Sequence, residues 1–165
     1  MSLKRIGAVL SRLHMDPEHR LWFMEQTICY FLSAASASSY LTFEKDLDQA
    51  RFVDLDITDE GVSMELGLCE HTCRHLSLSV AATTWLAEHG WLRDETDPWS
   101  CYGRRRLPSD GLRLARLVES AFTRAYELPI DYPAVASLET NTGADALVRI
   151  LNERSGQAWE AFAAR

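Results

Sequence analysis

The chain has 165 residues, which is the size of one domain with a conventional hydrophobic core. Hydrophobic residues make up 47% and charged residues 25%, as in globular domains and unlike disordered chains. No apolar run approaches the roughly 18 residues of a membrane span, and residues 1–5 do not open a signal-peptide core. The formal charge of -7 argues against sequence-independent binding to nucleic acid or to an anionic membrane. We expect a single cytoplasmic domain over residues 1–165, with four reduced cysteines and neither nucleic-acid nor membrane partners.

The charge is unevenly distributed along the chain. Residues 41–70 hold nine acidic and two basic side chains, a net of -7 that equals the charge of the whole chain. The basic run is Arg104–Arg106, which could contact a phosphate or an acidic partner. A solvated strand end explains such a short run better.

Two helices are predicted in the N-terminal part. The first follows from apolar residues at helical spacing, and the second runs from Asp16 to about Ala35. Asp16 can cap this second helix, and Pro17 and Glu18 suit its first turn. The apolar residues of the first helix are Leu3, Ile6, Val9, Leu10 and Leu13.

From Tyr40 the apolar period changes to two, which predicts strands with one face in water. The residues Thr58 to Gly61 have the composition of a tight turn, so residues 52–66 are predicted to form a hairpin. The alternating apolar positions are Leu41, Phe43, Val53, Leu55, Ile57, Val62, Met64 and Leu66.

The helical period returns in the second half of the chain. One helix is predicted around Ala82 and Trp85, with Ser77 or Ser79 as its cap and Gly90 as its end. A strand follows at residues 99–102, then a helix introduced by residues 108–110 that ends before Pro129. A loop containing Tyr132 precedes a last helix that begins near Gly143. This order predicts an α+β fold, with an antiparallel sheet flanked by N-terminal and C-terminal helices.

Cysteine and histidine alternate in residues 69–75, and zinc prefers both residue types. On a strand the four side chains would spread over some 20 Å, and on a helix only spaced pairs could meet. A second, distant ligand pair is missing as well, so a loop with buried thiols and exposed imidazoles is the better interpretation. A metal- or thiol-dependent sensor remains the alternative function, with Cys69, His71, Cys73 and His75 as its residues.

The sequence holds no nucleophile elbow, no Cys-His protease signature and no glycine-rich phosphate loop. Asp54 and Asp56 share one strand face roughly 6 to 7 Å apart, a spacing that glycosidase carboxylates also show. Any alternating strand produces that spacing, so a solvated face explains the pair better. We therefore expect no enzyme, no catalytic residue, no metal and no cofactor.

Four large aromatic residues fall within eighteen positions: Trp85, Trp91, Trp99 and Tyr102. For each one alone, a place in the core is the better interpretation. A sheet with acidic residues on one face and aromatic residues near one strand nevertheless suits the binding of a polypeptide.

Three segments resemble the YbjN-like and type III secretion chaperone-like (TY-Chap) family of actinobacteria. They are RFVDLDI at residues 51–57, GVSMELG at residues 61–67 and WLAEHGW at residues 85–91, within a likeness over about residues 20–135. His89 stands where the family has a leucine, and the proline that usually follows the tryptophan is delayed to Pro98.

The resemblance implies a curved antiparallel sheet flanked by helices, and a noncatalytic protein that binds extended client polypeptides, often as a homodimer. It carries over no individual binding residue, so the candidates come from the residues themselves: Phe52, Trp99 and Tyr102. Residues 140–165 lie outside the likeness and are predicted to be a C-terminal helical extension that covers the sheet or pairs two protomers.

Overall fold

The computed structural model describes residues 2–6, 16–34, 40–45, 48–68, 77–94, 96 and 100–140. These residues form a mixed fold of helices and an antiparallel sheet, as the sequence predicts. The elements in chain order are β1 (Ser2–Ile6), α1 (Pro17–Ala34), β2 (Tyr40–Lys45), β3 (Asp48–Thr58), β4 (Gly61–Leu68), α2 (Val80–Glu88), β5 (Leu92–Arg93), β6 (Ser100–Leu107), α3 (Gly111–Ser120), a π-helical continuation η1 (Ala121–Ala125) and β7 (Ala134–Thr140).

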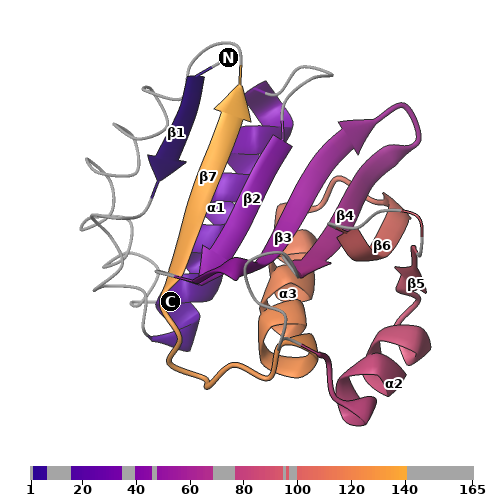
Figure 1. Cartoon of the computed structure of the whole chain (residues 1–165). Helices are drawn as coiled ribbons and strands as arrows, with labels where there is room; N and C mark the ends of the chain where they lie inside the picture. The colour runs from indigo at the N-terminus through magenta and orange to yellow at the C-terminus, as the bar shows by residue number, and fades with distance from the viewer. Residues whose placement is uncertain are drawn as a thin grey trace.

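The seven described strands form one sheet in the order β1-β7-β2-β3-β4-β6-β5, and each pairing is antiparallel. The last of the described strands, β7, therefore lies between β1 and β2. Helices α1 and α3 cover one face of the sheet, and α2 lies beyond it, next to β5 (Figure 1). We call the face under α1 and α3 the helix face, and the opposite face, which none of the described helices covers, the open face.

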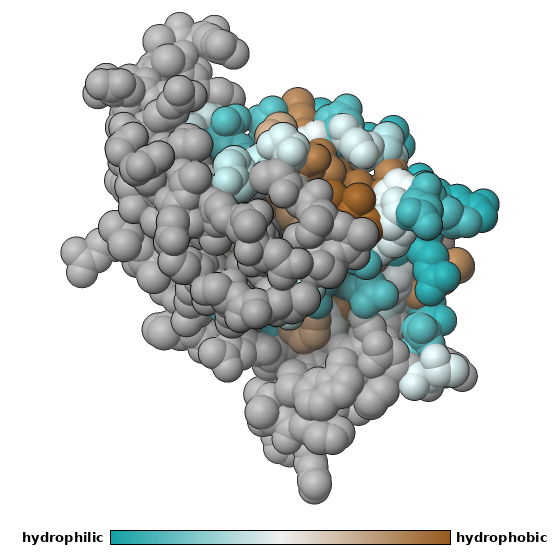
Figure 2. Space-filling model, turned by 90° about the horizontal axis from the view of Figure 1, so that it is seen from above, coloured by the Kyte–Doolittle hydropathy of each residue, from teal (hydrophilic) through white to brown (hydrophobic). Residues whose placement is uncertain are grey.

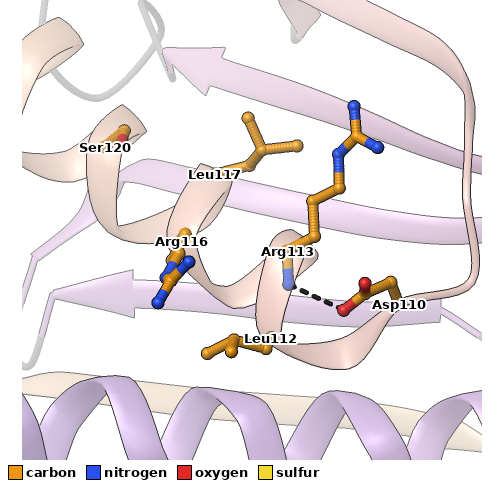
Figure 3. A pocket seen from close by; sticks show the side chains of 6 residues that line it. All are labelled: Asp110, Leu112, Arg113, Arg116, Leu117 and Ser120. Atoms are coloured by element: carbon orange, nitrogen blue, oxygen red, sulfur yellow. Dashed lines mark hydrogen bonds between the residues drawn. The ribbon is translucent and has the colours of Figure 1, made fainter.

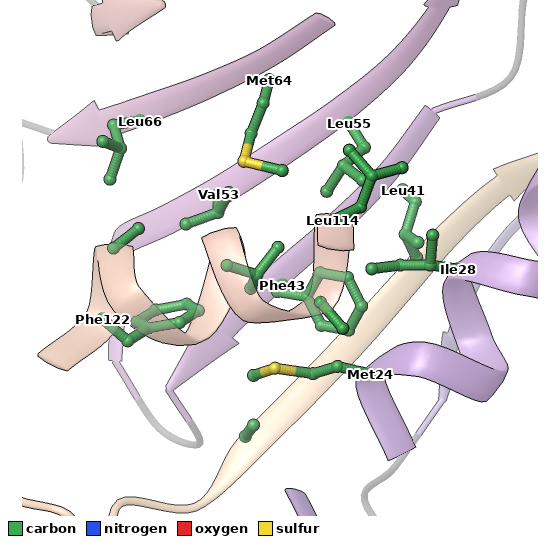
Figure 4. Close-up of a cluster of buried hydrophobic side chains, with 14 of the residues drawn as sticks. Met24, Ile28, Leu41, Phe43, Val53, Leu55, Met64, Leu66, Leu114 and Phe122 are labelled. Carbon is green, nitrogen blue, oxygen red and sulfur yellow. The ribbon is translucent and has the colours of Figure 1, made fainter. Parts of the chain in front are cut away.

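The core fills the space between the helix face and the two helices. Alternate residues in the middle of β2, β3 and β4 are buried there, which confirms the period of two in the sequence. They are Leu41, Phe43, Val53, Leu55, Val62, Met64 and Leu66, and Ile57 is half-buried. At the end of the sheet with the β3–β4 turn, hydrophobic residues are visible between hydrophilic ones (Figure 2). Figure 4 shows the centre of this layer, where Met24, Ile28, Leu114 and Phe122 from the helices meet Leu41, Phe43, Val53, Leu55, Met64 and Leu66 from the strands.

The predicted helix starts are confirmed by their capping hydrogen bonds. The Asp16 carboxylate accepts from the backbone N–H of Glu18 at 2.9 Å, at the start of α1. Ser79 caps α2 and Asp110 caps α3, each accepting from the N–H three residues later, at 3.1 and 3.0 Å. These side chains satisfy backbone donors that a helix cannot pair internally.

The predicted hairpin is also confirmed, because Thr58 pairs with Gly61 across a two-residue turn. Gly61 has φ +120°, and a Cβ atom there would lie 2.9 Å from the carbonyl oxygen of Leu107. The turn requires glycine at this position, both for its conformation and for the close approach of β6.

The predicted N-terminal helix is wrong where the structure describes it. Residues 2–6 form β1, which pairs with β7 from Ser2 opposite Thr140 to Ile6 opposite Ala136. Apolar spacing is a weak local signal, and in residues 2–6 continuous pairing with β7 overrides it. Residues 7–15 lie outside the described part of the chain.

The prediction of a loop after Pro129 is wrong from residue 134 onward, because β7 occupies residues 134–140. Ala134 and Ala136 are buried on the helix face, and Val135 is buried on the open face. A strand with both faces covered lacks alternation, so its pattern is easily taken for a loop. The predicted helix near Gly143 lies outside the described residues.

Candidate functional site

Tyr102 lies in β6 directly opposite Leu66, and its side chain is therefore on the helix face. It packs against the edge of the core and stays half-buried, as expected for a residue that can contact a partner. Its neighbour Gly103 pairs with Leu92 of β5, and Arg93 pairs with Tyr102 itself. Tyr102 thus lies one strand away from the end of the sheet.

Phe52 lies on the open face, on the side of β3 opposite Val53 and Leu55, as predicted. Its ring lies over Gly67 of β4, where an added Cβ atom would approach the ring to 1.8 Å. From the helix face, the Tyr126 hydroxyl lies 2.6 Å from the carbonyl oxygens of both Phe52 and Gly67. The structure therefore places Phe52 and Tyr102 on opposite faces rather than on one surface, and Trp99 lies outside the described residues.

The other two aromatic residues of the predicted cluster belong to α2 and its end. Trp85 stacks on His89 with ring centroids 4.5 Å apart. Trp91 is 3% exposed, and its backbone N–H donates to the carbonyl of Leu86 at 3.0 Å, so it folds back on the helix as predicted. Its indole N–H is buried and has no hydrogen-bond partner among the residues that the structure describes.

The four residues of the predicted sensor, Cys69, His71, Cys73 and His75, lie outside the described part of the chain. Among the residues that the structure describes, no three or more histidine, cysteine or acidic side chains converge on a point that could hold a metal ion.

The end of the sheet at β5 is short and partly apolar. Leu92 is 74% exposed, and within the described part of the chain the two residues of β5 pair with Tyr102 and Gly103 of β6 alone. Within the described residues, β6 has no strand partner on this side from Arg104 to Leu107. Arg106 leaves the extended conformation at φ +58°, and its guanidinium pairs with Glu60 at 2.9 Å.

A groove of about 390 Å³ runs along the outer side of α3. Its lining combines two arginines and two leucines with polar residues at either end (Figure 3). Arg113 and Arg116 are exposed, whereas Leu112 and Leu117 are half-buried. The lining residues are Asp110, Leu112, Arg113, Arg116, Leu117 and Ser120.

A buried ion pair that the sequence analysis missed joins α1 to α3. Arg20 is fully buried and forms a two-pronged ion pair with Glu119, with Nε to Oε2 at 2.9 Å. Its guanidinium also donates to the carbonyls of Ile130 and Tyr132, at 2.8 and 3.0 Å. The guanidinium carbon lies over the ring of Tyr132, 3.9 Å from the ring centroid.

The Tyr132 hydroxyl completes this cluster by donating to Glu119 at 2.7 Å. Burial raises the pKa of Tyr132 well above its ordinary value, and the Glu119 carboxylate raises it further, so the hydroxyl stays protonated. The cluster fixes the segment that leads into β7 against both helices. A sequence signal existed, because Arg20 shares the spacing of Met24 and Ile28 and so lies on the buried stripe of α1.

The prediction of a solvated face is wrong for Asp54 and correct for Asp56. Asp54 is half-buried on the open face and accepts a hydrogen bond from Thr42 at 2.5 Å, while Asp56 is exposed. Burial raises the pKa of Asp54 to about 6; Glu65 and Glu44 act in the same direction, and the Thr42 hydrogen bond opposes them.

Comparison of the chain with protein-family models, with curated proteins and with solved structures found no match. None of the helices in the described residues is long and apolar enough to cross a membrane.

Proposed function

We propose that this chain is a noncatalytic, chaperone-like protein that holds an extended segment of a client polypeptide at the β5 end of its sheet. The observation that carries this proposal is the two-residue edge strand with its exposed Leu92. A polypeptide can add a strand to such an edge, gaining affinity from main-chain hydrogen bonds and specificity from alternate side chains. The resemblance to the TY-Chap family supports the same class of function.

The register of β5 specifies what the client segment should look like. Leu92 pairs with Gly103 and lies on the open face, whereas Arg93 pairs with Tyr102 and lies toward the helix face. A strand added beside β5 would place alternate side chains next to Leu92 and next to Arg93. Because cross-strand neighbours on one face interact, we infer a client segment that alternates apolar and acidic residues.

The test uses a fluorescent ten-residue peptide of alternating valine and glutamate, and the same peptide with N-methyl groups on every second backbone amide. We expect the unmodified peptide to bind in an anisotropy titration and the methylated peptide to fail, because methylation removes the donors that pair with an edge. Equal binding of the two peptides, or no binding of either, would overturn the proposal.

A matched pair of variants locates the site. Leu92→Asp should weaken the peptide about tenfold or more, since it adds a repelling carboxylate at the edge. Val80→Asp adds the same charge at a residue of α2 that is 83% exposed, and it should leave the affinity unchanged. Equal losses in both variants would show that net charge, rather than the edge, controls binding.

We also propose that the protein acts as a homodimer, as the secretion-chaperone relatives often do. Sedimentation equilibrium of the full chain tests this directly. A mass of two chains at micromolar concentration is the expected result, and a mass of one chain would contradict it.

A further inference from the structure

The groove on α3 lies in the helix layer, away from the β5 edge, and it differs from that edge in its chemistry. Arg113 and Arg116 are about one helical turn apart on the exposed side of α3, and their side chains extend in different directions along the groove (Figure 3). Leu112 and Leu117 supply apolar surface between and beside them. The groove thus places two positive charges next to a strip of hydrocarbon.

The lining of the groove is net positive in a chain of net charge -7, because it carries Arg113 and Arg116 against the single acidic residue Asp110. The carboxylate of Asp110 is already engaged in capping α3. Neither Arg113 nor Arg116 forms an ion pair with any residue that the structure describes. Both side chains are exposed to solvent.

We propose that this groove binds an acidic amphipathic segment of a partner protein. A guanidinium offers a planar fork of N–H donors that matches a carboxylate, and two of them one turn apart match acidic side chains spaced three or four residues apart on a helix. The leucines accept the apolar side of the same segment. The positive charges of the arginines thus favour a partner segment with carboxylates on one side and apolar side chains on the other.

Two other occupants fit the groove less well. In a two-fold contact between α3 helices of two copies, centred on the groove, Arg113 of one would face Arg116 of the other, and the like charges would repel. Single-stranded nucleic acid is normally held by aromatic side chains as well as basic ones, and no aromatic residue appears among the described residues that line the groove.

The experiment uses a fluorescent 16-residue peptide with glutamate on one helical face and leucine on the other, titrated with the full chain. The double variant R113E/R116E should weaken binding about tenfold or more, because attraction becomes repulsion. The matched variant R105E/R124E makes the same change in net charge at two exposed arginines outside the groove, and it should change the affinity less than about twofold. Leu112→Ser should weaken binding without changing its salt dependence.

Several outcomes would overturn the proposal. Equal losses in the two double variants would show nonspecific charge attraction. Tighter binding of a single-stranded oligonucleotide, lost in R113E/R116E, would identify a nucleic-acid site instead, and loss of self-association in that variant would identify a contact between copies. The groove is independent of the β5 edge, so Leu92→Asp should leave the acidic helix bound, and R113E/R116E should leave the valine-glutamate peptide bound.

Discussion

Arg20 is a full positive charge with no exposure to solvent, and it is stabilised only because each prong of its guanidinium has a partner. Glu119 supplies the opposite charge, and the carbonyls of Ile130 and Tyr132 accept further hydrogen bonds. Removing one member of a buried pair leaves the other charge uncompensated, which costs more than the pair itself contributes.

We therefore expect Arg20→Ala to lower the free energy of unfolding by about 3–5 kcal/mol. The free energy of unfolding of Arg20→Lys should lie between those of Arg20→Ala and the wild type, because lysine keeps the charge but loses the two-pronged geometry. Urea unfolding followed by circular dichroism measures both. Arg124→Ala, at an exposed arginine, is the control and should change stability by less than about 0.5 kcal/mol. A loss at Arg20 no larger than at Arg124 would contradict the assigned role of the cluster.

Asp54 makes a second prediction at this scale, because its pKa in the folded protein is about 6 and that of an unfolded aspartate is about 3.9. The folded state binds the proton more tightly, so this group's contribution to stability is largest at low pH and is lost as the pH rises from about 4 to about 6. Asp54→Asn mimics the protonated form and keeps an oxygen to accept the Thr42 hydrogen bond.

At pH 8 we expect Asp54→Asn to be about 2–3 kcal/mol more stable than the wild type, and the difference should disappear below about pH 4. Urea unfolding at a series of pH values gives this difference, and Asp56→Asn, at the exposed neighbour, serves as the control. A difference that does not vary with pH would show that Asp54 is solvated after all.

At the scale of single elements, Phe52 and Gly67 behave as one cross-strand unit. The ring fills the space where a side chain at residue 67 would stand, and Tyr126 contacts both backbone carbonyls from the helix face. Gly67→Ala should therefore destabilise the protein by about 1–3 kcal/mol, because the ring must leave its place. In the Phe52→Ala background the same substitution should cost nothing or stabilise, since alanine fits a strand better than glycine.

A double-mutant cycle with urea unfolding measures the coupling between these two residues. We expect a coupling free energy of at least about 1 kcal/mol. Additive effects of the two substitutions would mean that the ring rests elsewhere in solution.

Elements whose chemistry is local were predictable from sequence, and elements that depend on a distant partner were not. Asp16 and Asp110 cap the helices that follow them, and residues 58–61 form the turn that their composition indicates. Strands β1 and β7 are different, because they are defined by pairing with each other and with β2 across most of the chain length. No short-range pattern carries that information.

At the scale of the whole molecule, the α+β class followed from the order of helical and alternating segments, while the candidate surfaces did not. Phe52 and Tyr102 were each placed on a strand correctly, but which face of the sheet Tyr102 occupies depends on its register against Leu66. The groove on α3 could not be predicted for a similar reason. The sequence shows that Arg113 and Arg116 lie on the polar side of an amphipathic helix, but the shape of the surface around them depends on how the helix packs.

The same layering predicts unequal stability across the molecule. Helix α1 buries seven residues between the sheet and α3, whereas α2 buries only Ala82 and Leu86. Helix α2 also leads into the two-residue β5 at the end of the sheet. Regions with few buried apolar side chains open without unfolding the rest of the protein.

We therefore expect the amides of α2 to open with a free energy at least about 2 kcal/mol below that of α1. Hydrogen exchange measured by NMR at increasing sub-denaturing urea checks this: α2 should open with a small dependence on urea and α1 with that of global unfolding. Leu86→Ala should lower the protection of the α2 amides against hydrogen exchange further. It should leave the difference between the opening free energy of α1 and the free energy of global unfolding unchanged. If α2 and α1 share one opening free energy and one urea dependence, the prediction is contradicted. The β5 edge would then be as stable as the core, and a client would add to a preformed edge.

The expected local opening of α2 has a different consequence, because it would allow the β5 edge to lengthen when the client binds.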